Sequence, residues 1–492
     1  MPKRAKNPKR AELAQREWVE EELGSLDLGD ARLDRRVKKL LGDMGAQPGA
    51  SLPKASGDLG GTKAAYRCLS HEDVEAQAIL EAHREAVVAR VRPERVVLAA
   101  QDTTTLNFST HPKTQGLGPV GNNRDKTLGL LLHSTLVLRE DGQALGLLER
   151  QLHARDPQQF KAGPAGARNR KPVEAKESVK WLHSLEATVQ AAHGLEQTRW
   201  INIADREADS YDLFWRLLEL RAAAETGVAA ARVELLVRSQ HNRALSTEQE
   251  RLFGHLAAQA VLGYYRFTVP RQAGQKARAA TLSVRVAEVS VPPPPDQVKY
   301  RGRQEPLRLW AIQALEEGPE AGSSPICWRL LSTLPVLDAA TAVLQVQRYS
   351  RRWEIELFHR TLKSGCQAES RQLETTERLA RCLMLDMLVA WRVLALSKAG
   401  RGEQAQQPVS LWLDTAEWQA LWCYIHQRTD PPETPPTTAE ATRWVAQLGG
   451  FLGRRSDGHP GAMTLWRGLQ RLNDFTRAYL LFTNPQKDVG NA

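Results

Sequence analysis

Residues 96–103 read Val-Val-Leu-Ala-Ala-Gln-Asp-Thr, and the first five of them are apolar. A short apolar run that ends in polar residues is typical of a buried strand. The chain changes character here, because the apolar spacing in residues 1–92 is helical and is interrupted by turns near Pro48 and Pro53. We therefore expect an α-helical domain at residues 1–92 and a different fold from residue 93 onward.

The stretch after this strand alternates between strand and helix patterns. Strands are predicted on both sides of Asp141-Gly142, because Asp-Gly is a strong hairpin signal. The full set of expected elements is strands at 128–138 and 145–152, a helix at 176–192, a strand at 200–204, a helix at 211–220 and a strand at 233–237. This order predicts an α/β layer.

The pattern changes again in the second half of the chain. Residues 264–269 and 282–291 alternate like strands, and Pro292–Pro295 ends them, which predicts a mainly β insertion at about 240–325. A long helix is expected at 339–362, so that one α/β domain with this insertion would span 93–400. Residues 401–492 are predicted to form a C-terminal helical region.

Composition narrows the class of protein. A chain of 492 residues with 42% apolar content is long enough for several domains, and its net charge of +10 favours a polyanionic partner such as nucleic acid. Its five cysteines are scattered and lack zinc-ligand spacing, and no apolar run reaches about 20 residues. We expect a cytoplasmic protein without a membrane partner.

A nucleotide cofactor is not expected. Gly116–Gly121 matches GxGxxG, but a polar stretch precedes it and Pro119 lies inside it, whereas a dinucleotide site needs a strand before the motif and a helix after it. The chain also has no GxxxxGK[ST] motif.

One predicted helix carries a concentrated set of charged side chains. Tyr349, Arg352, Glu356 and Lys363 are separated by three, four and seven residues. At about 100° per residue they fall within an arc of roughly 60°. Such a face would bind anions, with a carboxylate available for a metal ion.

Two aspartates are candidate partners for this carboxylate. Asp102 and Asp205 each close an apolar run, and ligand groups in α/β sheets collect at the carboxyl ends of strands. Two-metal phosphodiester chemistry requires several such carboxylates. Taken singly, Glu356 is as well explained by a surface ion pair, and each aspartate by a turn or cap.

Three stretches together resemble a known family. Tyr349–Lys363 resembles the YREK signature of the IS-four family of DDE transposases, which includes the Tn-five transposase. Asp102-Thr103-Thr104 and Asp205–Asp209 resemble the first-aspartate and second-aspartate motifs of that family. The resemblance extends weakly to the N-terminal helices and to Leu448–Phe451, although Leu357 and Leu362 depart from the family pattern.

The resemblance implies a fold and a set of roles. It implies a ribonuclease H-like core, with a mixed five-stranded sheet flanked by helices, in which Asp102, Asp205 and Glu356 bind Mg²⁺, with Mn²⁺ able to substitute. Tyr349, Arg352 and Lys363 would hold the phosphate beside the cleaved bond and a flipped base. Two further residues complete the implied set: Trp328 would stack on that base, and Arg238 would lie at the rim of the active site.

The same resemblance implies cut-and-paste transposition. A homodimer would pair two ends of double-stranded DNA in a synaptic complex, with residues 1–92 binding the ends and residues 401–492 dimerising. The expected steps are strand nicking, hairpin formation, hairpin opening and strand transfer to target DNA. The protein would then be nucleoid-associated when bound to DNA.

Two other functions remain open from the sequence. Tyr349 and Arg352 could serve a recombinase that attacks DNA through a tyrosine nucleophile, although Asp102 and Asp205 would then have no role. The chain could also be a catalytically inactive descendant that still binds DNA.

Overall fold

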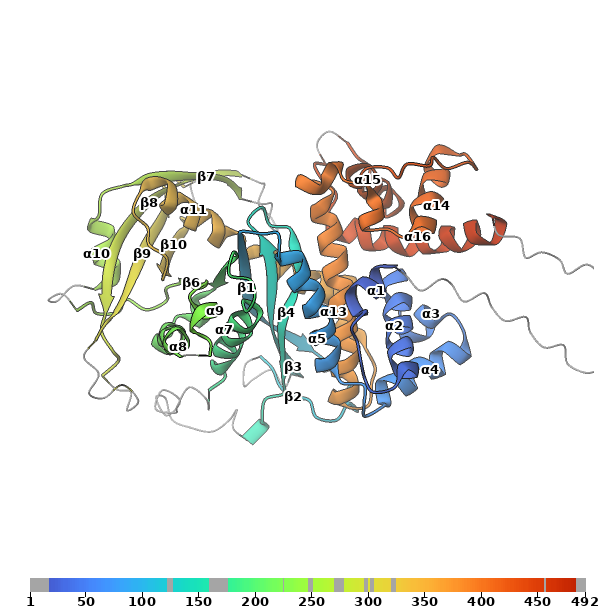
Figure 1. Ribbon diagram of the computed structural model, residues 1–492, viewed down its shortest axis with the longest axis horizontal. Coiled ribbons are helices and arrows are strands. Elements are labelled where there is room, and N and C mark those ends of the chain that lie inside the picture. Colours follow the sequence, from blue (N-terminus) through green and yellow to red (C-terminus); the bar gives the residue numbers. More distant parts are fainter. Residues whose placement is uncertain are drawn as a thin grey trace, which may run out of the picture. The chain divides into compact units, whose positions relative to one another are not determined.

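The computed structural model describes residues 17–121, 127–158, 176–223, 225–246, 251–269, 278–295, 300, 305–319, 324–454 and 457–483. The chain is a mixed α/β protein with one large mixed sheet and with helical N-terminal and C-terminal regions (Figure 1). It divides into two compact units, one of residues 1–86, 108–117 and 358–492 and the other of residues 87–107 and 118–357.

The second unit holds the sheet. Its strands are β1 (Val96–Asn107), β2 (Gly118–Pro119), β3 (Leu128–Arg139), β4 (Ala144–His153), β5 (Arg199–Ala204), β6 (Val233–Arg238), β7 (Gly263–Val269), β8 (Arg278–Val291), β9 (Leu307–Glu316) and β10 (Cys327–Ser332). Its helices are α7 (Val179–Ala191), η2 (Arg206–Ala208), α8 (Tyr211–Ala222), α9 (Gly227–Ala230), α10 (Leu252–Ala258) and α11 (Ala339–Ser350). Every strand and helix predicted between residues 96 and 237 is therefore present.

The strand order is β2-β3-β1-β5-β6-β10-β9-β8-β7, and β4 pairs with β3. β1, β5 and β6 run parallel to one another, whereas β3 and β4 pair antiparallel beside β1. β5 and β6 are buried along almost their whole length, as expected for parallel strands covered on both faces. One buried cluster joins α7 and α8 to these strands and includes Trp181, Leu185, Trp200, Phe214 and Leu217.

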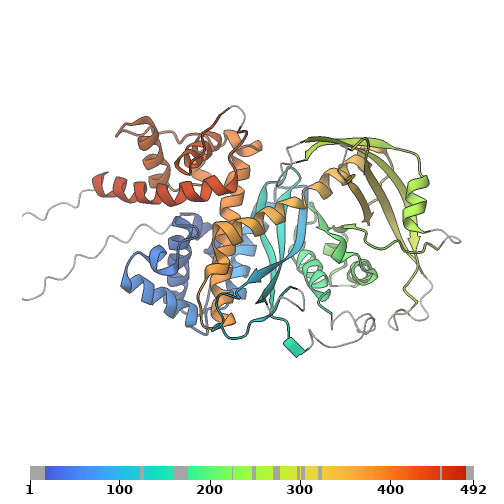
Figure 2. The ribbon, with the colours of Figure 1, turned by 180° about the vertical axis from the view of Figure 1, so that it is seen from behind.

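The strands predicted at 264–269 and 282–291 are present as β7 and β8, which begins four residues earlier than expected. They continue the same sheet, because β9 and β10 connect them antiparallel to β6. β9, β10 and α10 were not predicted. Figure 2 shows the unit from behind, where α11 packs across this part of the sheet and contacts β7 and β8.

Two expectations about individual elements are wrong. The first strand does not end at Asp102: β1 continues to Asn107, because β3 pairs with it along its full length, from Val97↔Arg139 to Asn107↔Gly129. The helix predicted at 339–362 is broken after Ser350. Arg351 and Arg352 donate their N–H groups three residues back at 3.0 Å, so a tight turn separates α11 from α12 (Trp353–Arg360).

Contacts distant in the sequence favour this turn. Arg348 Nε donates to the carboxylate of Glu140 at 2.8 Å, and Arg351 Nε donates to the carbonyl oxygen of Glu140 at 3.1 Å. Glu140 lies in the β3–β4 turn, so the hairpin fixes the end of α11. These partners lie more than 200 residues away, and helical spacing alone could not reveal them.

The first unit is helical. It contains α1 (Glu17–Leu23), α2 (Ala31–Ala46), α3 (Leu52–Ser56), α4 (Leu59–Ser70), η4 (Thr361–Gly365), η5 (Ala368–Ser370), α13 (Thr376–Ala399), η6 (Glu403–Gln406), η7 (Val409–Leu411), α14 (Thr415–His426), α15 (Thr438–Leu448) and α16 (Ala462–Thr483). The unit boundaries cut α5 (Ala76–Val91) and α12. Val393, Leu421, Val445, Leu465 and Leu469 belong to the core that joins α13 to α16.

The predicted boundaries after residues 92 and 400 stay predictions. Within the described residues, no helix is both long enough and apolar enough to cross a membrane.

Candidate active site

The register of the parallel strands aligns three predicted site residues. The pairing of β1 with β5 ends at Ala100↔Ile203, and continuing it by two residues puts Asp102 level with Asp205. Ala204 pairs with Val237 on β6, so the next step puts Asp205 level with Arg238. The two aspartates and the arginine therefore lie in a row across adjacent strands, where the parallel pairing stops.

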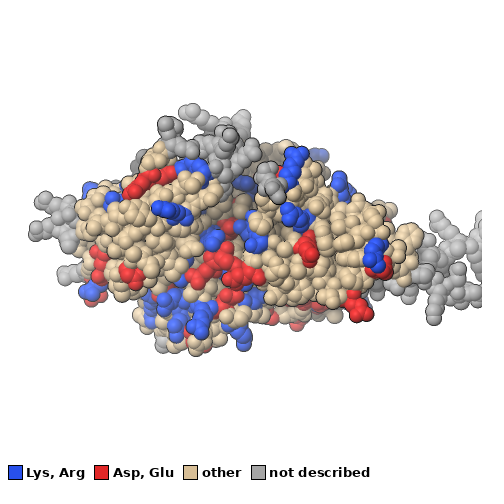
Figure 3. Space-filling view, turned by 90° about the horizontal axis from the view of Figure 1, so that it is seen from above, with Lys and Arg blue, Asp and Glu red and all other residues tan. Residues whose placement is uncertain are grey.

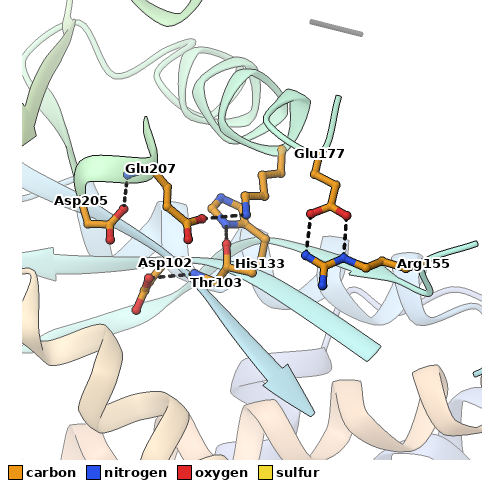
Figure 4. Close-up of polar contacts among 8 residues, drawn as sticks. Asp102, Thr103, His133, Arg155, Glu177, Asp205 and Glu207 are labelled. Carbon is orange, nitrogen blue, oxygen red and sulfur yellow. Dashed lines mark hydrogen bonds and ion pairs between the residues drawn. The ribbon is translucent and has the colours of Figure 1, made fainter. Parts of the chain in front are cut away.

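Local hydrogen bonds hold both aspartates in place. Asp102 accepts the N–H of Thr103 at 2.9 Å, and Asp205, the first residue after β5, accepts the N–H of Glu207 at 2.9 Å as the N-cap of η2. Figure 4 shows Asp102 on its strand, Asp205 at the start of η2, and the side chain of Thr103 hydrogen-bonded to His133 on β3 at 2.9 Å. Asp205 closes its strand as predicted, whereas Asp102 lies in the middle of a longer one.

Arg352 connects Asp102 to Glu356. Its Nη1 lies 3.8 Å from Oδ2 of Asp102, and its Nη2 donates to Oε1 of Glu356 at 2.5 Å. The Arg352 side chain is 14% exposed, so this ion pair is shielded from much of the solvent. The turn between α11 and α12 thus brings a cation and a carboxylate to the strand that carries Asp102.

The electrostatic balance at Asp102 reflects these neighbours. Burial raises the pKa of Asp102 from its usual 3.8 to about 6, against the opposing effects of the Arg352 charge and the Thr103 N–H. The negative charges of Asp205 and Glu356 raise the pKa further. Three acidic side chains therefore share one electrostatic environment in which negative charge is only partly balanced.

Tyr349 and Trp328 form an aromatic pair in the same unit. Their ring centroids are 5.4 Å apart at an angle of 67°, an edge-to-face contact. Arg238 donates to the carbonyl oxygen of Cys327, the residue before Trp328, at 3.1 Å. Tyr349 is only 3% exposed, and burial raises its pKa, so it does not lie on the open helix face that its spacing predicted.

Two further aromatic residues extend this pair and were not singled out from the sequence. Phe267 lies 5.8 Å from Trp328, and Tyr265 stacks on Phe267 at 5.3 Å, measured between ring centroids. Both come from β7, where alternate positions share one face of the strand. Their spacing in the predicted strand was the available signal, but their approach to Trp328 depends on the curvature of the sheet.

Lys363 belongs to the first compact unit, whereas the other predicted site residues belong to the second. It lies in the π-helical turn η4, so it does not continue the α-helical spacing of Glu356. Its Nζ is 3.9 Å from the carboxylate of Glu369.

The donor chemistry of the site fits a hard divalent cation, because Mg²⁺ prefers carboxylate oxygen and all three acidic side chains supply it. In the part of the chain that the structure describes, however, no three His, Cys, Asp or Glu side chains are close enough to hold one metal ion. Arg352 is the cation that pairs with Asp102 and Glu356 in this arrangement.

Asp209, the last residue of the second-aspartate stretch, has a structural role that sequence did not reveal. Its carboxylate accepts the N–H groups of Gln240 and His241 at 2.7 and 3.0 Å and pairs with Arg243. These residues follow β6, so Asp209 fixes the loop next to Arg238.

The distribution of Lys and Arg side chains does not by itself identify a DNA-binding surface. Figure 3 shows Lys and Arg side chains in several separate groups on one face, with acidic side chains among them. The net charge of +10 is therefore not gathered into one continuous stripe on that face.

Two family models match the ends of the chain. Residues 15–74 match the model described as "Transposase DNA-binding". Residues 388–481 match the model described as "Transposase Tn5 dimerisation domain". The first match covers α1–α4, and the second covers the end of α13 together with α14 and α15 and most of α16.

Proposed function

We propose that Asp102, Asp205 and Glu356 catalyse cut-and-paste transposition. The chain is a Tn5-type transposase, with an N-terminal transposase DNA-binding domain and a C-terminal Tn5 dimerisation domain. The central sheet unit would carry the chemistry, and the two terminal domains would bind transposon ends and pair two protomers.

The observation that carries this proposal is the electrostatic coupling of the three acidic residues. Arg352 contacts Asp102 and Glu356, and the charges of Asp205 and Glu356 both raise the pKa of Asp102. A carboxylate whose pKa is raised by burial and by neighbouring acidic groups is typical of a functional site. The acidic groups that act on Asp102 come from positions far along the chain, since Asp205 lies 103 residues after Asp102 and Glu356 lies 151 residues after Asp205.

The topology supports a ribonuclease H-like core. The strand order β4-β3-β1-β5-β6 comprises an antiparallel group of three followed by two parallel strands, with α7 and α8 packed against them. We propose that this five-strand part is the catalytic core and that β7–β10 belong to the insertion and its return.

Asp102, Asp205 and Glu356 would hold Mg²⁺, or Mn²⁺ in its place, and these ions would supply Lewis-acid stabilisation of the attacking and leaving oxygens. Arg352 would have to release Glu356 when the ions bind, because its guanidinium pairs with the same carboxylates that would hold them. The freed guanidinium offers paired N–H donors that suit the non-bridging oxygens of a phosphodiester.

The remaining site residues would position the substrate. Trp328 offers an indole ring on which an extruded base could stack, and such stacking recovers part of the cost of unpairing. Tyr349 supports that ring from its edge. Arg238 and Lys363 would add phosphate contacts.

The proposed reaction is a series of displacements at phosphorus. Water first cleaves one strand and leaves a 3′ hydroxyl. That hydroxyl attacks the opposite strand to form a hairpin, water opens the hairpin, and the 3′ hydroxyl finally attacks target DNA. Each step forms one phosphorus–oxygen bond and breaks another, so one site can serve all four.

A tyrosine-nucleophile recombinase fits the site less well. Tyr349 is buried, and its raised pKa disfavours the phenolate that would have to attack DNA. An inactive descendant would have no need to keep three coupled carboxylates, and the assay below separates it from an active enzyme.

The test is the Glu356→Gln variant, incubated with duplexes that carry the ends of the element and with Mg²⁺. The change keeps side-chain volume and removes a metal-binding charge, so we expect end binding within about threefold of wild type and nicking reduced by at least 10³-fold. Glu186→Gln is the matched control, because Glu186 makes a half-exposed ion pair with Arg216 on α8. Substantial Mg²⁺-dependent nicking by Glu356→Gln would refute the assignment.

A further inference from the structure

The C-terminal helical region contains a pocket whose lining includes none of the predicted site residues. Its walls come from the last turn of α13, from α15 and from the loop before α16, and its volume is about 310 Å³. The lining residues are Ser397, Gly400, Arg401, Ala439, Thr442, Arg443, Gly458, His459 and Pro460. None of them is acidic, whereas Arg401 and Arg443 are permanently charged.

The basic side chains of this pocket are accessible to a ligand. Arg401, Arg443 and His459 are exposed. The side chains of both arginines make no hydrogen bond or ion pair with the residues that the structure describes. Elsewhere in the same region arginines are paired, as Arg428 is with Asp430 and Arg392 with Glu417.

Thr442 adds a second, independent observation. It is 2% exposed, and its hydroxyl has no hydrogen-bond partner among the described residues. A buried hydroxyl without a partner costs about 1–3 kcal/mol. Thr442 packs closely on the end of α13, because a Cβ added to Gly400 would lie only 2.7 Å from the Cβ of Thr442. Thr442 lines the pocket, and an acceptor bound beside this hydroxyl would remove the cost.

We propose that this pocket binds a phosphate group of the DNA backbone, as a DNA contact separate from the catalytic residues. Two guanidinium groups and a hydroxyl donor suit the non-bridging oxygens of a phosphodiester. Because both arginines are exposed, a phosphate that remains attached to a nucleic-acid chain can reach them. The inference rests on the chain being a DNA-binding protein and does not depend on Asp102, Asp205 or Glu356.

The test measures binding of a fluorescent duplex of arbitrary sequence to the full chain, without divalent cations, at several salt concentrations. Three variants are compared: Arg401→Gln/Arg443→Gln, Thr442→Val, and the control Arg467→Gln, an exposed arginine of α16 outside the pocket. For the double variant we expect about tenfold weaker binding at 0.1 M salt and a salt slope reduced by about 1 to 2. The control should leave the affinity unchanged.

Thr442→Val separates a binding role from a structural one. It removes an unpaired hydroxyl at nearly constant volume, so thermal stability should be equal to or higher than that of wild type. We nevertheless expect about threefold weaker duplex binding, which a purely structural role would not produce.

Free phosphate and a second copy of the chain are the competing occupants. If millimolar inorganic phosphate raises Tm through this pocket while the double variant binds duplex as the control does, the pocket takes a free anion and the proposal fails. If the double variant loses dimerisation in sedimentation but not duplex affinity, the site belongs to a protein interface, and the proposal again fails. Because cleavage is not measured, neither result bears on the Glu356→Gln test.

Discussion

At the residue scale, Arg352 is the side chain that connects two of the acidic residues of the candidate active site. It pairs with Asp102 and Glu356, so it balances part of the negative charge that the three carboxylates gather. In the proposed mechanism the same guanidinium exchanges these partners for a phosphate. A lysine at this position would keep the charge but lose the paired donors.

We therefore predict that Arg352→Ala weakens the binding of duplex ends. The slope of log affinity against log salt concentration should become shallower by about 1. Arg352→Lys should restore much of the salt dependence but leave cleavage at least tenfold below wild type, because bidentate geometry is lost. Arg216→Ala, which breaks a surface ion pair on α8, is the control. An unchanged salt slope for Arg352→Ala would show that this residue does not contact phosphate.

At the scale of elements, the β8–β9 pair depends on a buried ion pair at its end. Glu316, the last residue of β9, pairs with Arg278 at the start of β8 and also accepts the N–H of Ile326 at 3.0 Å. The hydrogen bonds from Arg278 hold the pKa of Glu316 below its usual 4.5, although burial opposes them. A carboxylate with a lowered pKa stabilises the folded state above the unfolded pKa, and this contribution is lost as pH falls through the folded pKa.

We predict that Glu316→Gln speeds amide hydrogen exchange in β8 and β9 near pH 7, corresponding to a loss of about 1–3 kcal/mol of local stability. The difference from wild type should shrink as pH falls below about 4.5, where the wild-type carboxyl itself becomes protonated. Exchange rates corrected for intrinsic chemistry measure both effects. A difference that stays constant down to pH 3 would exclude this linkage.

At the scale of the whole molecule, the first unit joins segments from opposite ends of the chain through one buried cluster. Arg371 pairs with Asp386 on α13, with Nε to Oδ2 at 2.9 Å, and donates to the carbonyl oxygens of Ala50 and Cys366. Arg371 is 6% and Asp386 1% exposed. The cluster therefore ties the loop after α2, within the DNA-binding match, to the long helix that enters the dimerisation match.

We predict that Asp386→Ala lowers the free energy of unfolding of this unit by about 3–5 kcal/mol, because it leaves Arg371 buried without its counter-charge. Arg371→Met/Asp386→Leu should recover most of that loss, since replacing both charges removes the unpaired one. Urea unfolding, followed by the fluorescence of the tryptophans, measures the two variants. If the single and double variants are equally unstable, packing and not charge explains the cluster.

Elements whose sequence signal is local lie where the sequence predicts them. Alternation and 3.6-residue spacing predicted the helical start, the β3–β4 hairpin, and the order of strand and helix from β1 to β6. The two aspartates and Glu356 were also identified from sequence, by their motifs, as candidates. Their catalytic roles stay predictions, as do the contacts assigned to Lys363, Trp328 and Arg238.

The sequence by itself determined which segments could bury an apolar face, because that property repeats along a strand or a helix. Only the tertiary structure decided where elements end and which charges meet: β3 extends β1 past Asp102, and Glu140 fixes the turn that breaks the helix before Arg352. The physical reason is the same in each case. A hydrogen bond or an ion pair to a partner far along the chain can outweigh local preference, and the local pattern contains no record of that partner.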